Sequence, residues 1–289
     1  MKIFSTNISS YVSLICLLLA PPFLADAAVS PFYNPPAAYL VQVNGQVFRQ
    51  RNAHTRRAPA SLTKIMTALI VMERCNLDEV VVVSRGAASE TGSRIGLRGG
   101  ERLKVRDLLA ATLMASANDA ARALADHTCG NQKDFVVQMN ARARALHLDD
   151  TRFSNACGHD STRLYTTAHD LAILTEKAMQ HPFLAKVVAR RDMRIYTVNG
   201  KRSFYLRNKN RLIGRYRGAV GVKTGTTPNA GQCLVALAER EDRRVLVVIM
   251  HARNRWRTAP AMLDAAFAAS SSAAGNSNGN RIKETQEIR

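Results

Sequence analysis

The sequence predicts an α+β domain in which strands from both ends of the chain form one antiparallel sheet and a helical block is inserted between them. Strand-like runs occur early, at 38–48, and again late, at 219–250, whereas residues 105–179 have a mostly helical pattern. An amphipathic stretch, Arg255 to Ala269, then predicts a closing helix. With 289 residues, 46% of them hydrophobic, the chain can bury a large core.

The individual elements follow from local pattern. Ala38–Val43 and Gln46–Phe48 flank Asn44-Gly45, which is the strongest short signal for a β-hairpin. Apolar residues at helical spacing predict a helix from Ser61 to about Cys75. The other expected elements are a strand at Val80–Val83, a surface loop at Gly86–Gly100, helices at Val105–His127 (interrupted at Ser116–Asp119), Gly130–Leu148 and Thr166–Met179, and strands at Arg194–Val198, Ala219–Thr224, Gln232–Leu237 and Val245–Met250.

Residues 1–27 have the layout of a secretory signal peptide. Lys2 precedes the apolar run Tyr11–Ala20, and Ala25 and Ala27 are the small residues that cleavage after Ala27 requires. The run is too short, and too soon followed by prolines, to span a membrane comfortably. We therefore expect an exported protein, periplasmic or secreted to the cell envelope, with its folded domain over 28–269.

The C-terminal end, 270–289, predicts a disordered tail. It begins with a stretch rich in Ser, Ala, Gly and Asn, which cannot bury enough apolar surface to fold. The last residues mix both charge signs and are too short and polar to anchor in a bilayer, which argues against membrane association. The oligomeric state is left open.

The formal net charge is +19, from 41 Lys and Arg against 22 Asp and Glu. Such an excess suits polyanionic surroundings, such as an acidic cell-wall matrix. The basic residues are scattered, no run of five occurs, and aromatic residues make up only 6%. This pattern favours a solvated basic surface and argues against a nucleic-acid partner.

Four cysteines follow the signal segment: Cys75, Cys129, Cys157 and Cys233. They allow three full pairings, and the sequence does not choose between two disulfides and buried thiols with one bridge. Their spacing contains no Cys-x-x-Cys, and the histidines form no His-Glu-x-x-His. We therefore expect neither a metal nor a cofactor.

The first chemical motif is Ser61-Leu62-Thr63-Lys64. Positions i and i+3 of a helix share a face, about 5–6 Å apart at Cβ, so Ser61 and Lys64 can meet as nucleophile and base. Lys64 can accept a proton only as a neutral amine, which requires burial or a nearby cation. Alone the motif is weak, because Ser-x-x-Lys arises by chance roughly once in such a chain and Ser61 could simply cap a helix.

The second motif, Ser116-Ala117-Asn118, lies between two helical stretches. Ser116 could pass a proton from Lys64 to a leaving amine, and Asn118 could hold a substrate amide while positioning Lys64. The alternative is a polar joint between helices.

The third motif, Lys223-Thr224-Gly225-Thr226, ends a strand-like run. Gly225 would let a substrate backbone approach and pair with the strand edge. Lys223 would attract a substrate carboxylate and help to lower the pKa of Lys64. The alternative is a strand that ends in a basic turn.

Together the three motifs, in this order, resemble those of the serine-type D-alanyl-D-alanine carboxypeptidases, the low-molecular-mass penicillin-binding proteins of peptidase family S11. The similarity extends over about Ala38 to Phe267 and includes Thr167-Ala168-His169-Asp170-Leu171-Ala172. It implies a β-lactamase/transpeptidase-like fold: an antiparallel sheet flanked by helices, a helical subdomain, and an active site in the cleft between them.

The resemblance also implies an activity. Ser61 would attack the penultimate D-Ala carbonyl of a peptidoglycan stem peptide, release the terminal D-Ala, and be inhibited covalently by β-lactam antibiotics. The backbone N–H groups of Ser61 and Thr226 would form the oxyanion hole. Lys223 and Thr224 would bind the terminal carboxylate. Arg255 aligns with a family arginine that assists, although it is also typical of a solvated arginine at a helix start.

Three alternatives stay open. A D,D-endopeptidase of the same group would cut crosslinks between stem peptides, and single-domain exported members favour it. A β-lactamase would need a deacylating base, and no Glu-x-x-Leu-Asn segment supplies one. A catalytically inactive cell-wall binding module would not need all three motifs. One segment, Asn155–Asp160, departs from the usual Asn-Pro-x-Gly-Leu pattern of the family.

Overall fold

The structure, a computed structural model, describes residues 34–284, with side chains as far as residue 269. The predicted signal peptide therefore lies outside the described residues. The disordered tail from residue 270 stays a prediction. Among the described helices, none combines the length and the apolar character needed to cross a membrane.

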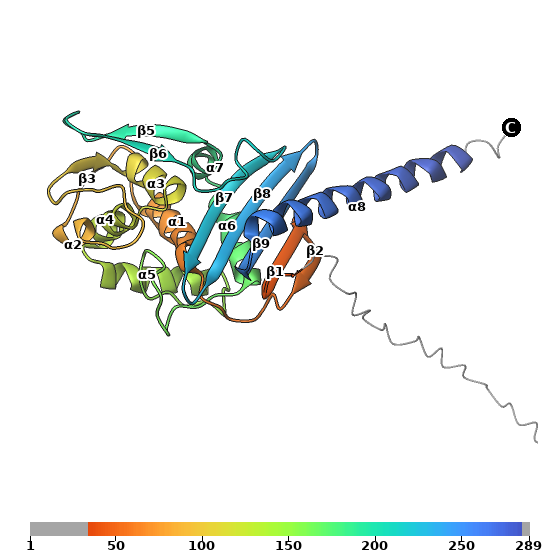
Figure 1. The fold of residues 1–289 in the computed structure, drawn as a ribbon, viewed down its shortest axis with the longest axis horizontal. Helices are drawn as coiled ribbons and strands as arrows, with labels where there is room; N and C mark the ends of the chain where they lie inside the picture. The colour runs from red at the N-terminus through yellow and green to blue at the C-terminus, as the bar shows by residue number, and fades with distance from the viewer. Residues whose placement is uncertain (1–33, 285–289) are drawn as a thin grey trace, which may run out of the picture. The chain divides into compact units, whose positions relative to one another are not determined.

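A five-stranded antiparallel sheet with the order β2-β1-β9-β8-β7 forms the centre of the fold (Figure 1). Strand β1, from the start of the chain, pairs with β9, from near its end, with Leu40 opposite Val248. This confirms the predicted sheet built from both ends of the chain. The strands are β1 (Ala38–Val43), β2 (Gln46–Arg51), β7 (Ala219–Thr227), β8 (Gly231–Arg240) and β9 (Arg243–Ala252).

Helices cover both faces of this sheet (Figure 1). Helix α8 (Arg255–Glu284) packs on one face through buried residues such as Leu263. Helices α1 (Lys64–Arg74) and α6 (Ala168–Met179) lie on the other face. Because both faces are buried, the middle of β8 and β9 reads as a continuous apolar run rather than an alternating one.

The helical block inserted between the strands forms the second part of the fold (Figure 1). It packs against α1 through α3, α4 and α5. Its elements are η1 (Ala60–Thr63), α2 (Arg85–Ala88), α3 (Val105–Met114), α4 (Asn118–Cys129), α5 (Gln132–Ala145) and α7 (Pro182–Val188), with the two-stranded sheets β3 (Val80–Val82) with β4 (Arg102–Lys104) and β5 (Asp192–Tyr196) with β6 (Ser203–Arg207).

The structure differs from the predicted elements in several places. The helix expected from Ser61 begins as a 3₁₀ turn, η1, and becomes α-helical only at Lys64. The predicted loop 86–100 begins inside the short helix α2. Strands β4 and β6 and helix α7 were not predicted, because three to seven residues are too few for a periodic signal.

Burial of α8 on the sheet predicts a measurable contribution to stability. Leu263 is fully buried against β8 and β9, so Leu263→Ala should lower the free energy of unfolding by about 2–5 kcal/mol. Chemical denaturation measures this change, with Arg257→Ala on the exposed side of the same helix as the control. A loss below about 0.5 kcal/mol, the range typical of a surface substitution, would contradict this packing.

Candidate active site

Ser61 lies in the 3₁₀ turn that immediately precedes α1. Ala60 has a positive φ of 49°, which is uncommon for a residue other than glycine and bends the chain sharply before Ser61. The Thr63 hydroxyl donates to the Ala60 carbonyl at 2.9 Å and closes the turn. Ser61 itself is partly exposed, so its hydroxyl can be reached from solvent.

The Lys64 amine contacts three oxygens from three separate segments. Its Nζ is 3.1 Å from Ser61 Oγ, 2.6 Å from Asn118 Oδ1 and 2.5 Å from the Cys157 carbonyl oxygen. The Lys64 side chain is fully buried. The predicted encounter of Ser61 and Lys64 is therefore present, and it is supported by two oxygens from elsewhere in the chain.

Burial disfavours the charged form of Lys64 and lowers its pKa from 10.5 to about 8, with the cation of Lys209 acting in the same direction. A neutral amine has two N–H donors and one lone pair. In that form Lys64 can donate to Asn118 and to the Cys157 carbonyl, and its lone pair can accept the Ser61 proton. The three contacts match the hydrogen-bonding needs of a general base.

Ser116 and Asn118 form the wall beside this amine. Ser116 has a positive φ of 58° and separates α3 from α4, which explains the predicted interruption at this point. The Asn118 amide group donates to the Thr91 carbonyl at 2.6 Å, and its backbone N–H donates to the Ser93 carbonyl at 2.7 Å. Asn118 thus fixes both Lys64 and the loop that contains Ser93.

Asp119, the next residue, holds the same loop. Its fully buried carboxylate accepts backbone N–H groups of Ile95, Gly96 and Leu97 at 2.9–3.3 Å. Several backbone donors satisfy a buried carboxylate without a cation. The predicted surface loop is therefore anchored next to the cleft.

Lys223 lies on β7, opposite the first lysine. Its buried amine donates to Ser116 Oγ at 2.9 Å and to the Thr224 carbonyl at 2.8 Å. Burial lowers the pKa of Lys223 well below its ordinary value, and the nearby Lys64 adds to this effect. Burial and the Lys209 cation are the causes that lower the pKa of Lys64. The predicted effect of Lys223 on the same pKa stays a prediction.

Gly225 lets β7 pack directly against the Ser61 turn. A Cβ at this position would lie 3.0 Å from the Pro59 carbonyl oxygen and 3.1 Å from the backbone nitrogen of Ser61. A side chain here would push the strand away from the nucleophile. The backbone amides of Ser61 and Thr226, expected to form an oxyanion hole, consequently lie in the same part of the cleft.

Arg255, at the start of α8, supports the end of β7. Its Nη1 donates to the Gly225 carbonyl at 2.5 Å, to Thr226 Oγ1 at 2.8 Å and to the Cys233 carbonyl at 3.0 Å. Desolvation lowers its pKa. The alternative of a solvated arginine at a helix start does not describe these contacts.

The turn around Cys157 supplies an oxygen that sequence reasoning missed. The Asn155 side-chain oxygen accepts the backbone N–H groups of Cys157, Gly158 and His159, which aims the Cys157 carbonyl at Lys64. Gly158 has φ +89°, and a Cβ there would lie 1.9 Å from the Ala60 carbonyl oxygen. The segment that departs from the family pattern thus packs under the nucleophile. In the sequence, Asn155 and Gly158 were the residues that could have indicated this turn.

The residues predicted from the three motifs meet in one cleft. A cavity of about 710 Å³ is lined by Ser61, Ser93, Ser116, Arg207, Asn208, Lys209, Arg211, Arg215, Thr224, Gly225, Thr226, Arg255 and Trp256. The amines of Lys64 and Lys223 contact the hydroxyls of Ser61 and Ser116 in that lining. The cleft therefore presents two hydroxyls, each backed by a buried amine with a lowered pKa.

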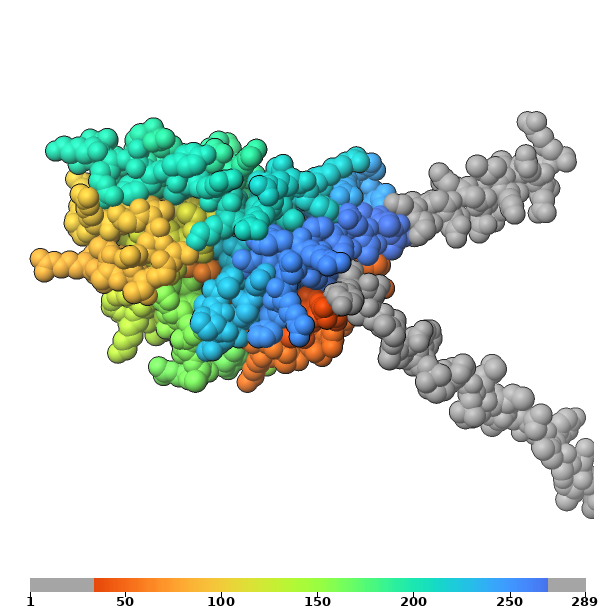
Figure 2. Space-filling model, viewed as in Figure 1, coloured from red at the N-terminus to blue at the C-terminus, as the bar shows by residue number. Residues whose placement is uncertain are grey.

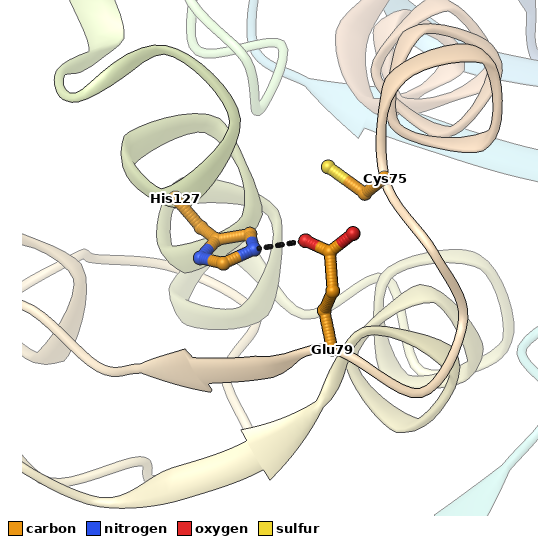
Figure 3. A group of neighbouring side chains, drawn as sticks. All are labelled: Cys75, Glu79 and His127. Carbon is orange, nitrogen blue, oxygen red and sulfur yellow. Dashed lines mark hydrogen bonds and ion pairs between the residues drawn. The ribbon is translucent and has the colours of Figure 1, made fainter.

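A separate group of possible metal ligands lies at the end of α1. Cys75, Glu79 and His127 place one ligand atom each within 4.8 Å of one another (Figure 3). His127 Nε2 and Glu79 Oε2 are 3.0 Å apart, and Cys75 Sγ contacts the Thr128 hydroxyl at 3.4 Å. These contacts tie α1 to α4, and none of the residues lines the cavity that contains Ser61. The four thiols of the described chain, at 75, 129, 157 and 233, are free.

A hydroxyl nucleophile beside a buried amine, with a second hydroxyl and amine facing it, defines a serine acyl-transfer enzyme of the DD-peptidase class. The sequence pattern of the D-alanyl-D-alanine carboxypeptidases, peptidase S11, matches residues 33–254. The chain belongs to this family.

Its relatives include more than one kind of enzyme. It is 36% identical over 239 residues to D-alanyl-D-alanine carboxypeptidase DacF of Bacillus subtilis, covering 80% of this chain and 61% of that protein. It is 30% identical to the D-alanyl-D-alanine endopeptidase of Escherichia coli, covering 88% of this chain and 84% of that one. The chain thus spans about three fifths of the length of DacF.

The fold matches a solved structure closely. The crystal structure of the Streptomyces K15 DD-transpeptidase has a TM-score of 0.77 and 30% sequence identity, covering 83% of this chain and all of that one. Its similarity confirms the predicted α+β transpeptidase-like fold.

The lowered pKa of Lys64 predicts how acylation depends on pH. Only the neutral amine accepts the Ser61 proton, so the rate of labelling by a fluorescent penicillin should rise about tenfold per pH unit below 8 and level off above it. Labelling reactions quenched at a series of times and read by gel fluorescence measure this rate. A rate independent of pH between 6 and 9 would contradict the assignment of Lys64 as the base.

Lys64→Arg provides the control, because a guanidinium stays protonated throughout this range. The variant should label far more slowly at every pH, and circular dichroism checks that it is folded.

Proposed function

We propose that this protein is a serine-type D-alanyl-D-alanine carboxypeptidase, which removes the terminal D-Ala from peptidoglycan stem peptides through an acyl-enzyme on Ser61. The observation that carries the proposal is the contact of Ser61 Oγ with the buried Lys64 amine, 3.1 Å away. Lys64 takes the Ser61 proton as the oxygen attacks the penultimate D-Ala carbonyl. The backbone N–H groups of Ser61 and Thr226 stabilise the resulting oxyanion.

Collapse of the tetrahedral intermediate requires a proton for the leaving D-Ala amine. Lys64 returns the proton that it took from Ser61, and the Ser116 hydroxyl passes it on to that nitrogen; the Lys223 amine holds Ser116 Oγ in place at 2.9 Å. Asn118 holds Lys64 in place through its side-chain oxygen, and its amide nitrogen ties it to the Thr91 carbonyl. Water then hydrolyses the ester on Ser61 and restores the free enzyme.

The substrate carboxylate is bound at the end of β7. Thr224 lines the cavity there, and the Lys223 amine, which donates to the Thr224 carbonyl, lies directly behind it. Arg255 keeps the Gly225 carbonyl and the Thr226 hydroxyl in position. A substrate that ends in a carboxylate next to the scissile bond fits this arrangement. β-Lactams carry a carboxylate too, and they would inhibit covalently because Ser61 opens their strained amide ring and the ring nitrogen stays attached to the acyl group.

The proposed substrate also fits an exported protein. Peptidoglycan lies outside the cytoplasm, and residues 1–27 have the pattern of a secretory signal. We propose that the enzyme acts in the cell envelope, in the periplasm or after secretion.

A second candidate is a D,D-endopeptidase that cuts crosslinks between stem peptides. The match to the Escherichia coli endopeptidase, which extends over 84% of that protein, favours it. The two activities share the acyl half of the substrate and differ in the leaving group, a single D-Ala or a whole second stem.

Mass spectrometry of digestion products separates these activities. The purified enzyme should convert a stem pentapeptide to the tetrapeptide and leave a crosslinked dimer largely intact. Faster cleavage of the dimer would instead favour the endopeptidase. Ser61→Ala should abolish both the cleavage and labelling by penicillin, and residual labelling of this variant would refute Ser61 as the nucleophile.

A further inference from the structure

One part of the lining of the Ser61 cavity is densely cationic. Arg207, Lys209, Arg211 and Arg215, here called the cationic rim, line the same cavity as Ser61. They come from one stretch at the end of β6 and in the loop that leads to β7. Figure 2 shows this teal-coloured stretch reaching from the yellow helical region to the blue sheet. The residues that line the cavity include Arg255 as a fifth cation and neither aspartate nor glutamate.

The rim is not neutralised from within the protein. In the part of the chain that the structure describes, the fourteen ion pairs involve none of the four rim residues. Lys209 Nζ donates to the Ser93 hydroxyl at 2.6 Å, and Arg211 lies 5.6 Å above the Trp256 ring. The positive charges of the cationic rim are therefore available to a bound anion.

The loop that carries the rim is fixed in place. Asn208 donates to the carbonyls of Val188 and Arg190, and Asn210 donates to the Gly221 carbonyl at 2.8 Å. Leu212 is buried among the residues that pack on α8. Because hydrogen bonds hold this loop in place, its cations need little reordering when a ligand binds. Their attraction for an anion can therefore contribute fully to the choice of ligand.

The cationic rim begins near the proposed site for the terminal carboxylate, at the leaving-group end of the cleft. Arg211 and Arg255 both lie over the ring of Trp256, with guanidinium carbons 5.6 and 4.9 Å from its centroid. Arg255 contacts Thr226, next to the proposed site for the terminal carboxylate. Lys209 donates a hydrogen bond to Ser93, which lines a different part of the same cavity. The rim thus extends away from that site along the cavity.

We propose that the cationic rim is an anion subsite that selects peptides carrying free carboxylates in addition to the terminal one. The proposal rests on the proposed peptidase function and specifies its substrate class. Unpaired cations in a concave site attract an anionic ligand and orient it before reaction. Peptides in which these carboxylates are amidated lose this attraction and react more slowly.

Carboxylates can reach the rim from two parts of a substrate. One source is an acidic side chain upstream of the scissile bond, in the part that acylates Ser61. The other is an acidic group on a larger leaving group, as in a crosslinked stem. Two matched pairs of synthetic peptides distinguish these sources, each pair differing only by a carboxylate or a carboxamide, on the acyl side in one pair and on the leaving side in the other.

The experiment measures kcat/KM for all four peptides. In the wild type the carboxylate should be preferred to the carboxamide by roughly five- to tenfold in at least one pair, as expected for several exposed charge pairs. The preference should shrink as salt is raised. The triple variant Arg207→Gln, Arg211→Gln, Arg215→Gln should reduce the ratio to about one, and the corresponding triple lysine variant should restore most of it.

The matched control is Arg51→Gln, which removes one positive charge from β2, at the opposite edge of the sheet from β7. It should leave the ratio unchanged. A ratio that the triple glutamine variant does not alter would overturn the subsite, even if every peptide is cleaved. If the wild type cleaves none of the four peptides, the proposed function fails and the inference with it. Because each ratio is taken within one variant, a general loss of activity cancels.

Discussion

The burial of one amine, that of Lys64, is the constraint on which the site depends. Three segments meet at its nitrogen: the Ser61 turn, the start of α4 through Asn118, and the turn that presents the Cys157 carbonyl. A charged amine without a paired anion is costly to bury, so the fold favours the neutral form that a general base requires. The same packing that folds the helical block therefore creates the reactivity.

A second lysine and two strained residues complete this arrangement. Lys223 is buried on the facing strand, and its pKa is also lowered. Ala60 and Ser116 both have positive φ values, a conformation that costs of order 1–3 kcal/mol at a residue other than glycine. Such costs persist where the surroundings fix the backbone. Here Ala60 precedes the Ser61 hydroxyl and Ser116 carries the second hydroxyl of the cleft. The strained backbone is therefore found where the two reactive hydroxyls are positioned.

Much of the fold and the site could be predicted from the sequence, because hairpin, helix and motif signals are local. Ser61, Lys64 and Ser116 could be named from the motifs because their side chains carry the chemistry. The Cys157 contact was missed, since it is made by a backbone carbonyl, and Asn155 and Gly158 signal only that a turn forms there and not that it points at Lys64. The cationic rim could not be assigned to the site either, because four basic residues within 207–215 read as an ordinary basic loop, and only the fold shows that they line the same cavity as Ser61.

Direct titration tests whether burial lowers the pKa of Lys64 to about 8. Carbon-13 NMR of protein labelled at the lysine ε-carbons, with Lys64→Arg used to assign the signal, gives the pKa of this amine without reference to activity. The account predicts a midpoint near pH 8. A midpoint near the ordinary lysine value of 10.5 would contradict it, because the neutral amine that accepts the Ser61 proton would then be roughly 300-fold scarcer at neutral pH.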